Sequence, residues 1–266
     1  DIDSVKMYLS ANGDVNARIQ TGVFQKDTLL NASLNNYEMM KLLLENGADP
    51  NLEAGVNNRQ KRNTLHKLAY ESRVCKRGSS INQFEHVDKN DYSRQIKLLC
   101  KHGADINAVD NNEGTPLSIL RKSADQNTVA NIKALVRAGA NIDNDSMLGV
   151  IAEDNIELFD YFNASGATIC TEFASTDYRY DGLGYSELTL AIKNNANTIA
   201  LALIERGADV NFIACFNFIE SQPIYVAIYN DNTEIFRDLI EAGSEYEEAL
   251  AMTAQKQLTD SLDKLI

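Results

Sequence analysis

The chain has 266 residues, of which 44% are hydrophobic, and its 38 acidic and 25 basic side chains give a net charge of −13. This composition predicts a folded protein with a sizeable core, and no apolar run approaches the roughly 18 residues of a membrane-spanning helix. Because affinity for phosphates depends on clustered Lys and Arg, the acidic balance argues against nucleic acid and membrane surfaces as the main partners.

The charge is divided unevenly along the chain. Residues 1–133 hold 18 basic and 16 acidic side chains, whereas residues 134–266 hold 7 and 22, so the two net charges are +2 and −15. We expect the two halves to face different partners. A basic partner surface is predicted for the C-terminal half.

The cysteines indicate the redox state of the protein's compartment, and the first residues indicate whether a signal peptide is present. Without C-x-x-C spacing, a disulfide framework is not indicated, and a reducing, cytoplasmic compartment is favoured. The chain begins at an aspartate and shows no signal-peptide pattern, so we expect a piece of a longer protein. The cysteines are Cys75, Cys100, Cys170 and Cys215.

The first predicted element is a helix over residues 3–12, which ends before a glycine. The same succession of an apolar helical segment, a glycine and a small residue recurs along the chain, for example as KLLLENGAD and IKLLCKHGAD. Glycine is expected to end each helix because it adopts a positive φ without a Cβ penalty. A last helix is predicted over residues 250–265, where leucines recur at helical spacing. The glycines are Gly13, Gly47, Gly103, Gly139, Gly166, Gly207 and Gly243.

A second signature between these glycines predicts the start of another helix. It reads TPLS at residues 115–118, and Pro116 suits the first helical turn because its missing N–H would be unpaired there. Each repeating unit is thus predicted to be helix, turn, helix, glycine stop and exposed loop. Degenerate copies lie at 27–30, 63–66, 186–189 and 222–225. The predicted N-cap residues are Asp27, Asn63, Thr115 and Ser186.

This pattern resembles the ankyrin repeat family, whose unit of about 33 residues carries TPLHxA and GADVN motifs at these relative positions. The resemblance covers essentially the whole chain. It implies an all-α ankyrin-repeat solenoid of about seven helix-turn-helix repeats with incomplete terminal repeats, in a single domain over residues 1–266. The chain departs from the family because a full TPLH never occurs, the fourth unit has only DSML at 145–148, and its GATI motif lacks the acidic residue and the asparagine. These departures affect local geometry rather than the solenoid.

Three segments exceed the family's spacing. About 19 extra residues fall between the two helices of the third unit, at about 72–92, while the loops at about 171–185 and at 212–221 are lengthened by roughly eight and three residues. Insertions on repeat scaffolds lie in loops, where function concentrates. The resemblance implies that such loops project as fingers and line a concave binding face with the inner helices.

Aromatic residues of the two lengthened fingers and the inner helix behind them are the candidate protein-binding site. Tyr and Phe offer large contact areas at a low entropic cost, which makes them frequent anchors of interfaces. The alternative is that many of these rings pack finger against finger. The candidates are Phe173, Tyr178, Tyr180, Tyr185, Phe212, Phe216, Phe218, Tyr225 and Tyr229.

A basic run between residues 59 and 77 is a secondary candidate surface. Its two ends are predicted at opposite ends of one inner helix, so they need not form one patch. A solvated face is one interpretation, and a docking site for an acidic protein segment or an anionic head group is the other. The residues are Arg59, Lys61, Arg62, Arg73, Lys76 and Arg77.

The sequence predicts no catalytic, cofactor or metal site. Cys75 and His86 share the insertion, but ten intervening residues match no zinc spacing, and phosphate-binding and nucleophile motifs do not occur. The resemblance implies that His66 makes a structural hydrogen bond between repeats. It also places four asparagines where asparaginyl hydroxylases modify ankyrin domains: Asn16, Asn51, Asn107 and Asn211.

The predicted function is a protein-interaction scaffold, expected to be a monomer, that binds a partner through the concave face and fingers. Its 28 asparagines and degenerate repeats look like those of ankyrin effectors that intracellular bacteria deliver into the host cytosol, which would make the partner a host protein. One alternative is a recruitment module of a larger enzyme whose catalytic domain lies outside this chain. Another places an activity inside the insertion.

Overall fold

The computed structural model describes residues 1–20, 22, 27–53, 61–74, 92–112, 114–120, 126–167, 186–216, 219–247, 249–251 and 254. The chain divides into two compact units, Asp1–Ile142 and Asp143–Ile266, which we call unit 1 and unit 2. The expectation of a single domain over residues 1–266 stays a prediction.

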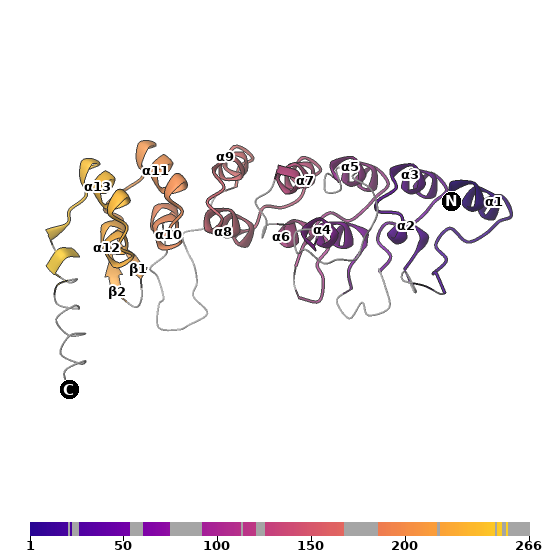
Figure 1. The fold of residues 1–266 in the computed structure, drawn as a ribbon, viewed down its shortest axis with the longest axis horizontal. Coiled ribbons are helices and arrows are strands. Elements are labelled where there is room, and N and C mark those ends of the chain that lie inside the picture. The colour runs from indigo at the N-terminus through magenta and orange to yellow at the C-terminus, as the bar shows by residue number, and fades with distance from the viewer. Residues whose placement is uncertain are drawn as a thin grey trace, which may run out of the picture. The chain divides into compact units, whose positions relative to one another are not determined.

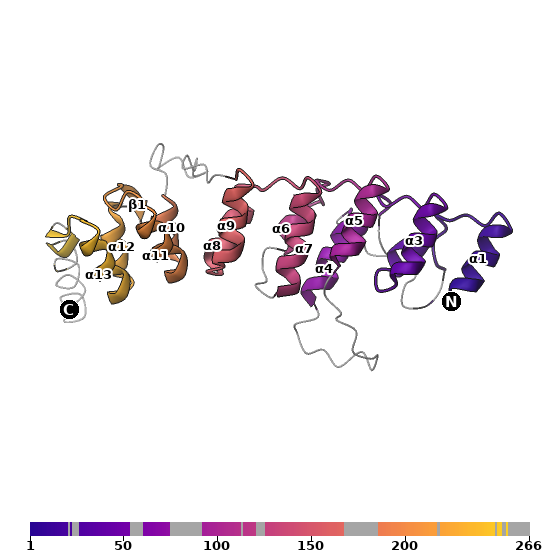
Figure 2. The same cartoon turned by 90° about the horizontal axis from the view of Figure 1, so that it is seen from above.

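Unit 1 consists of two layers of helices (Figure 1). The inner helices α2, α4 and α6 pack side by side, as do the outer helices α3, α5 and α7, and α1 precedes them as an outer helix (Figure 2). The helices are α1 Ile2–Ser10, α2 Leu29–Ala32, α3 Tyr37–Glu45, α4 Thr64–Val74, α5 Ser93–Lys101, α6 Pro116–Leu120 and α7 Gln126–Arg137.

Unit 2 repeats this arrangement with three helix pairs. The inner helices α8, α10 and α12 pack in one layer, and α11 packs between α9 and α13 in the outer layer. A short hairpin joins α11 to α12. The elements are α8 Asn144–Ala152, α9 Ile156–Ala164, α10 Glu187–Lys193, α11 Asn197–Glu205, β1 Ala214–Phe216, β2 Ile219–Ser221, α12 Pro223–Tyr229 and α13 Thr233–Glu241.

Six of the seven predicted glycine stops are confirmed. The glycines after α3, α5, α7, α9, α11 and α13 have positive φ values between 81° and 102°, a region that other L-residues rarely adopt. The prediction is wrong at Gly13, because Asn12 takes the positive φ of 59° instead. At Gly13 itself, a Cβ would lie 2.5 Å from the ring of Tyr8, so a larger residue would displace this exposed ring.

The predicted helix starts are also largely confirmed. Ser186 caps α10 by accepting from the Thr189 amide at 3.1 Å, and Asn63 and Thr115 accept from the amides three residues on at 3.1 and 3.2 Å. The cap of α2 is Thr28 rather than the predicted Asp27, so that helix starts one residue later. The Asp27 carboxylate instead forms an ion pair with Lys67.

Four asparagines in the loops connect neighbouring repeats. Within unit 1, Asn51 accepts a hydrogen bond from the Asp105 amide at 2.8 Å and donates one to the Gly103 carbonyl at 2.9 Å. Asn107 bonds the following repeat in the same way, as does Asn211 in unit 2, and Asn16 accepts from the Asp49 amide. The positions that resemble hydroxylation sites therefore hold adjacent repeats together.

Candidate functional site

The predicted finger at residues 212–221 is built as a hairpin. β1 and β2 pair antiparallel, with Ala214 opposite Ser221 and Phe216 opposite Ile219. Such pairing satisfies the backbone groups of a short projecting loop, which water would otherwise have to solvate. The hairpin precedes α12 directly, so the finger and this inner helix form one continuous element of unit 2.

The aromatic candidates on and beside α12 differ in exposure. Tyr229 is 42% exposed, Phe212 is half-buried, and Tyr225 is only 4% exposed. The ring centroids of Tyr225 and Tyr229 lie 6.4 Å apart, as expected for tyrosines one helical turn apart. The prediction of a binding anchor is corrected at Tyr225, because this residue is buried, whereas Tyr229 is exposed. The side chains of Phe173, Tyr178, Tyr180, Tyr185, Phe216 and Phe218 lie outside the described residues.

A cavity of about 460 Å³ lies where the N-terminal end of α12 meets the loop after α13. Tyr246 in this loop is 40% exposed, and the glutamates on either side of it are also exposed. Carboxylates and the face of a tyrosine ring both attract cations, so the cavity suits a Lys or Arg side chain. Sequence reasoning missed these residues, although the acidic run EYEE at 245–248 marks them. The lining residues are Gln222, Ser244, Glu245, Tyr246 and Glu247.

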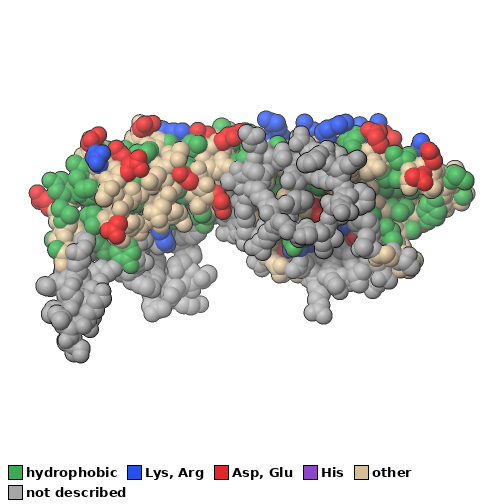
Figure 3. All heavy atoms as spheres, in the orientation of Figure 1, with side chains coloured by type: hydrophobic (Ala, Val, Ile, Leu, Met, Phe, Trp, Pro, Cys, Tyr) green, Lys and Arg blue, Asp and Glu red, His purple; other side chains and the backbone are tan. Residues whose placement is uncertain are grey.

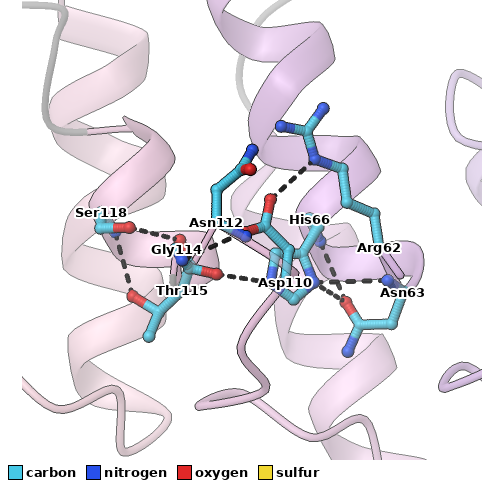
Figure 4. A network of polar contacts seen from close by, with 8 residues as sticks. All are labelled: Arg62, Asn63, His66, Asp110, Asn112, Gly114, Thr115 and Ser118. Carbon is cyan, nitrogen blue, oxygen red and sulfur yellow. Dashed lines mark hydrogen bonds and ion pairs between the residues drawn. The ribbon is translucent and has the colours of Figure 1, made fainter. Parts of the chain in front are cut away.

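Arg62, predicted on the basic surface, is held between two repeats of unit 1 (Figure 4). Its Nε donates to Oδ2 of the buried Asp110 at 3.1 Å, and its guanidinium lies 5.2 Å from the centre of the Tyr70 ring. Asp110 also accepts from the amides of Asn112 at 2.8 Å and Gly114 at 3.0 Å. Arg62 is therefore a corrected assignment, because its charge supports the contact between repeats.

The other residues of the predicted basic surface lie around α4. Lys61 is exposed and has a positive φ of 50°. The backbone of Arg73 belongs to α4, whose length separates Lys61 from Arg73 as predicted, but the Arg73 side chain lies outside the described part of the chain. Arg59, Lys76 and Arg77 lie outside it entirely.

His66 has the structural role that was expected. The ring is completely buried. In the neutral ring, Nε2–H donates to the Gly114 carbonyl at 3.0 Å, and Nδ1 accepts from the Asn63 amide at 3.3 Å (Figure 4). Burial lowers the pKa of His66, which keeps the ring neutral, while the hydrogen bond to Gly114 and the charge of Asp110 oppose this shift. With both nitrogens engaged, His66 has no free nitrogen for proton transfer.

For Asp110, hydrogen bonds outweigh the effect of burial on the pKa, whereas burial dominates for His66. Burial alone would raise the pKa of its carboxyl, but hydrogen bonds from Asn112, Gly114 and Arg62 stabilise the carboxylate and lower the pKa overall. Within the described residues, no three His, Cys, Asp or Glu side chains lie together as a metal site would require. Burial raises the pKa of the Cys100 thiol, which disfavours the reactive thiolate.

Both ends of the insertion are held by one buried side chain of α7. Asn131 Oδ1 accepts from the Tyr92 amide at 2.7 Å, and its Nδ2 donates to Ser72 Oγ at 3.2 Å. Ser72 and Tyr92 are the bounds that the sequence predicted for the insertion. Cys75 and His86, the candidates for an activity inside it, lie outside the residues that the structure describes.

Comparisons with known proteins agree with this architecture. The ankyrin repeat model matches residues 28–54, which contain α2, α3 and the loop that follows. Two similar structures are the human ASB11 ankyrin repeat domain and the ankyrin repeat domain of Bcl-3, described as a unique member of the IkappaB protein family. Each has a TM-score of 0.56 and 17% identity over 82% of this chain, and the matches cover 85% and 87% of their own chains. This chain has the ankyrin-repeat fold.

At 17% identity, the similarity to these structures concerns the fold. No curated protein matches the ankyrin-repeat chain in sequence. Ankyrin repeat domains generally mediate protein–protein interactions. Within its described part, the chain contains no helix both long enough and apolar enough to span a bilayer.

Proposed function

We propose that this ankyrin-repeat chain binds a partner protein through the finger and inner helix of unit 2. The observation that carries the proposal is the set of side chains around α12: Tyr229 is exposed at its C-terminal end, and the acidic cavity with Tyr246 lies at its N-terminal end. Ile213, just before the hairpin, is also 51% exposed. Exposed aromatic rings beside carboxylates suit a partner surface that presents Lys or Arg.

The test compares partner capture by the wild-type chain and by a Tyr229→Ala/Tyr246→Ala variant. Both rings are exposed, so circular dichroism is expected to show an intact fold. We expect the variant to lose at least tenfold in affinity for a captured partner, because truncated aromatic anchors typically cost more than 1 kcal/mol each. Tyr70→Ala, at an equally exposed tyrosine on α4 of unit 1, is the matched control.

The finger residues predicted from the sequence form a second arm of this test. Replacing Tyr178, Tyr180, Phe216 and Phe218 by alanine is expected to weaken the same complex. Full recovery of the partner by both the finger variant and the α12 variant would contradict the proposed site. Loss on changing Arg73, Lys76 and Arg77 alone would move the site to the insertion.

We further propose that the chain acts without catalysis of its own, as a monomer in the cytoplasm. His66 has both ring nitrogens engaged, and Cys100 has a raised pKa, so neither supports nucleophilic chemistry. A role as a bacterial effector that binds a host protein is supported by the asparagine content of 28 in 266 residues and by the degenerate repeats. Capture from host lysate followed by mass spectrometry would identify the partner and test that role.

A further inference from the structure

The outer helices of unit 1 carry a second charged surface. Helices α5 and α7 contain five basic side chains and no acidic one. Four of these are exposed and Lys133 is half-exposed, and the two helices pack side by side. Figure 3 shows Lys and Arg gathered over α3, α5 and α7. The five residues are Arg94, Lys97, Lys101, Lys133 and Arg137.

The repeat register aligns these cations. Lys41, Lys97 and Lys133 each lie six residues before the positive-φ glycine that ends their helix. Lys101 and Arg137 each lie two residues before it. Since packed helices are about 8–10 Å apart, the equivalent positions form rows across α3, α5 and α7 with about that spacing. We call this surface the basic outer face.

The three helices of the basic outer face carry a net positive charge. Helices α3, α5 and α7 hold six basic side chains and two acidic ones, Glu38 and Glu45, which gives +4. Lys41 lies 4.0 Å from Glu45, and Arg94 lies over the Tyr37 ring at 4.3 Å.

The ankyrin architecture does not itself require this charge. In unit 2, the outer helices α9, α11 and α13 carry six acidic side chains and one basic one, Arg237, for a net charge of −5. The same positions of the same fold are thus acidic in one unit and basic in the other. The positive charge of α3, α5 and α7 is therefore a property of this sequence and not of the fold.

We propose that the basic outer face binds an acidic α-helical segment of a partner protein. A helix advances about 10.5 Å in seven residues, so carboxylates at i and i+7 would match the spacing between the rows. A protein segment fits better than a membrane surface, because none of the large hydrophobic side chains exposed among the described residues lies on α3, α5 or α7 to insert into lipid. This surface lies on unit 1 and on outer helices, so it is independent of the proposed site on unit 2.

The experiment uses the full chain and a fluorescent, alanine-based helical peptide of about 21 residues with glutamates in one stripe at i, i+3 and i+7 spacing. A scrambled peptide of the same composition spreads the charge around the helix. Fluorescence anisotropy at about 50 mM salt is expected to show tighter binding of the striped peptide, with affinity falling as salt screens the charges.

Charge reversal then locates the site. The Lys97→Glu/Lys101→Glu/Arg137→Glu variant is expected to bind the striped peptide at least tenfold more weakly. Its matched control, Lys6→Glu/Lys193→Glu/Arg237→Glu, changes the net charge equally at exposed positions outside the face, and its affinity should stay within about twofold of wild type. Unchanged thermal melts of both variants would show that folding is not affected.

Three results would overturn the proposal. If both variants bound the striped peptide equally weakly, overall charge and not the basic outer face would explain the binding. If the striped and scrambled peptides bound equally well, the partner would not need to be a helix with its charges along one side. Tighter binding to phosphatidylserine vesicles or to a short nucleic-acid duplex than to the striped peptide, abolished by the same reversal, would reassign the face to that ligand.

Discussion

A single ring, His66, connects two repeats of unit 1 through the hydrogen bond from Nε2 to the Gly114 carbonyl, while Nδ1 is held by Asn63 of its own repeat. The burial of the ring makes this contact sensitive to pH. Because the pKa of His66 in the folded chain is lowered, the unfolded chain binds more protons than the folded one below the ordinary value of about 6.5. The contribution of His66 to the free energy of unfolding is therefore expected to be complete above pH 6.5 and to decrease as the pH falls toward the pKa of the folded chain. Asp110, whose pKa is also lowered, begins to contribute its own loss only below about 3.8.

This prediction is tested by urea unfolding of the wild type and of His66→Gln between pH 7.5 and 5. The variant should be less stable at pH 7.5 but lose less stability on acidification than the wild type. His102→Gln, at the C-terminal end of α5, is the control for replacing a histidine by glutamine. A wild-type slope that persists in His66→Gln would show that another group titrates in this window.

At the scale of elements, α11 depends on the preceding repeat for its N-cap. Its own N-cap residue, Ala196, has no side chain that can accept a hydrogen bond. Asp154, in the turn after α8, instead accepts from the amides of Thr198 and Ile199, both at 3.0 Å. Asp154 has a positive φ of 50°, so its backbone geometry is also special. The helix start and the turn of another repeat are thus coupled through one carboxylate.

Replacing Asp154 separates these two roles. Asp154→Gly keeps the positive φ but removes the cap, so it should cost about 1 kcal/mol of unfolding free energy, whereas Asp154→Ala should cost more because alanine is strained there. Asp231 has a positive φ of 54° in the equivalent turn before α13, whose cap is supplied by Asn232. Asp231→Gly should therefore be nearly neutral. If urea unfolding gave equal losses for the two glycine variants, the cap would not be the cause.

The sequence predicted the helix pairs because their signals are local. Glycine stops and the caps Asn63, Thr115 and Ser186 depend on chemistry within four residues, and the structure confirms them. The contacts of Asp154 and Asn131 could not be predicted, because each partner is about 40 residues away in sequence or more, and only the packing of repeats brings them together. Arg62 was misassigned for the same reason, since its partner Asp110 belongs to the next repeat.

The candidate site was predicted less completely than the fold. Aromatic content led to the proposed site on the finger and α12, which stays a prediction. The exposed fraction separates Tyr229 from Tyr225, and it follows from which side of the helix faces the core. The acidic cavity joins α12 to a loop about 20 residues later, so the sequence offered only the composition of that loop.

At the scale of the whole molecule, the uneven charge along the sequence corresponds to two units of different net charge. Unit 1 has 19 basic and 16 acidic side chains, a net of +3, and unit 2 has 6 and 22, a net of −16, which together give −13. A high net charge destabilises a compact state through self-repulsion, and salt screens this repulsion. Stability should therefore depend on salt in unit 2 much more than in unit 1.

Residues 1–142 and 143–266, expressed separately, allow a direct comparison, because each unit has its own packed layers of helices. Raising sodium chloride from about 20 to about 500 mM should raise the melting temperature of residues 143–266 by several degrees and shift that of residues 1–142 by no more than about two. Each half serves as the other's control for general salt effects. Equal shifts would mean that the charge of unit 2 is already balanced by its internal contacts, and a decrease for residues 143–266 would mean that attractive pairs such as Arg206 with Asp160, 2.7 Å apart, outweigh the repulsion.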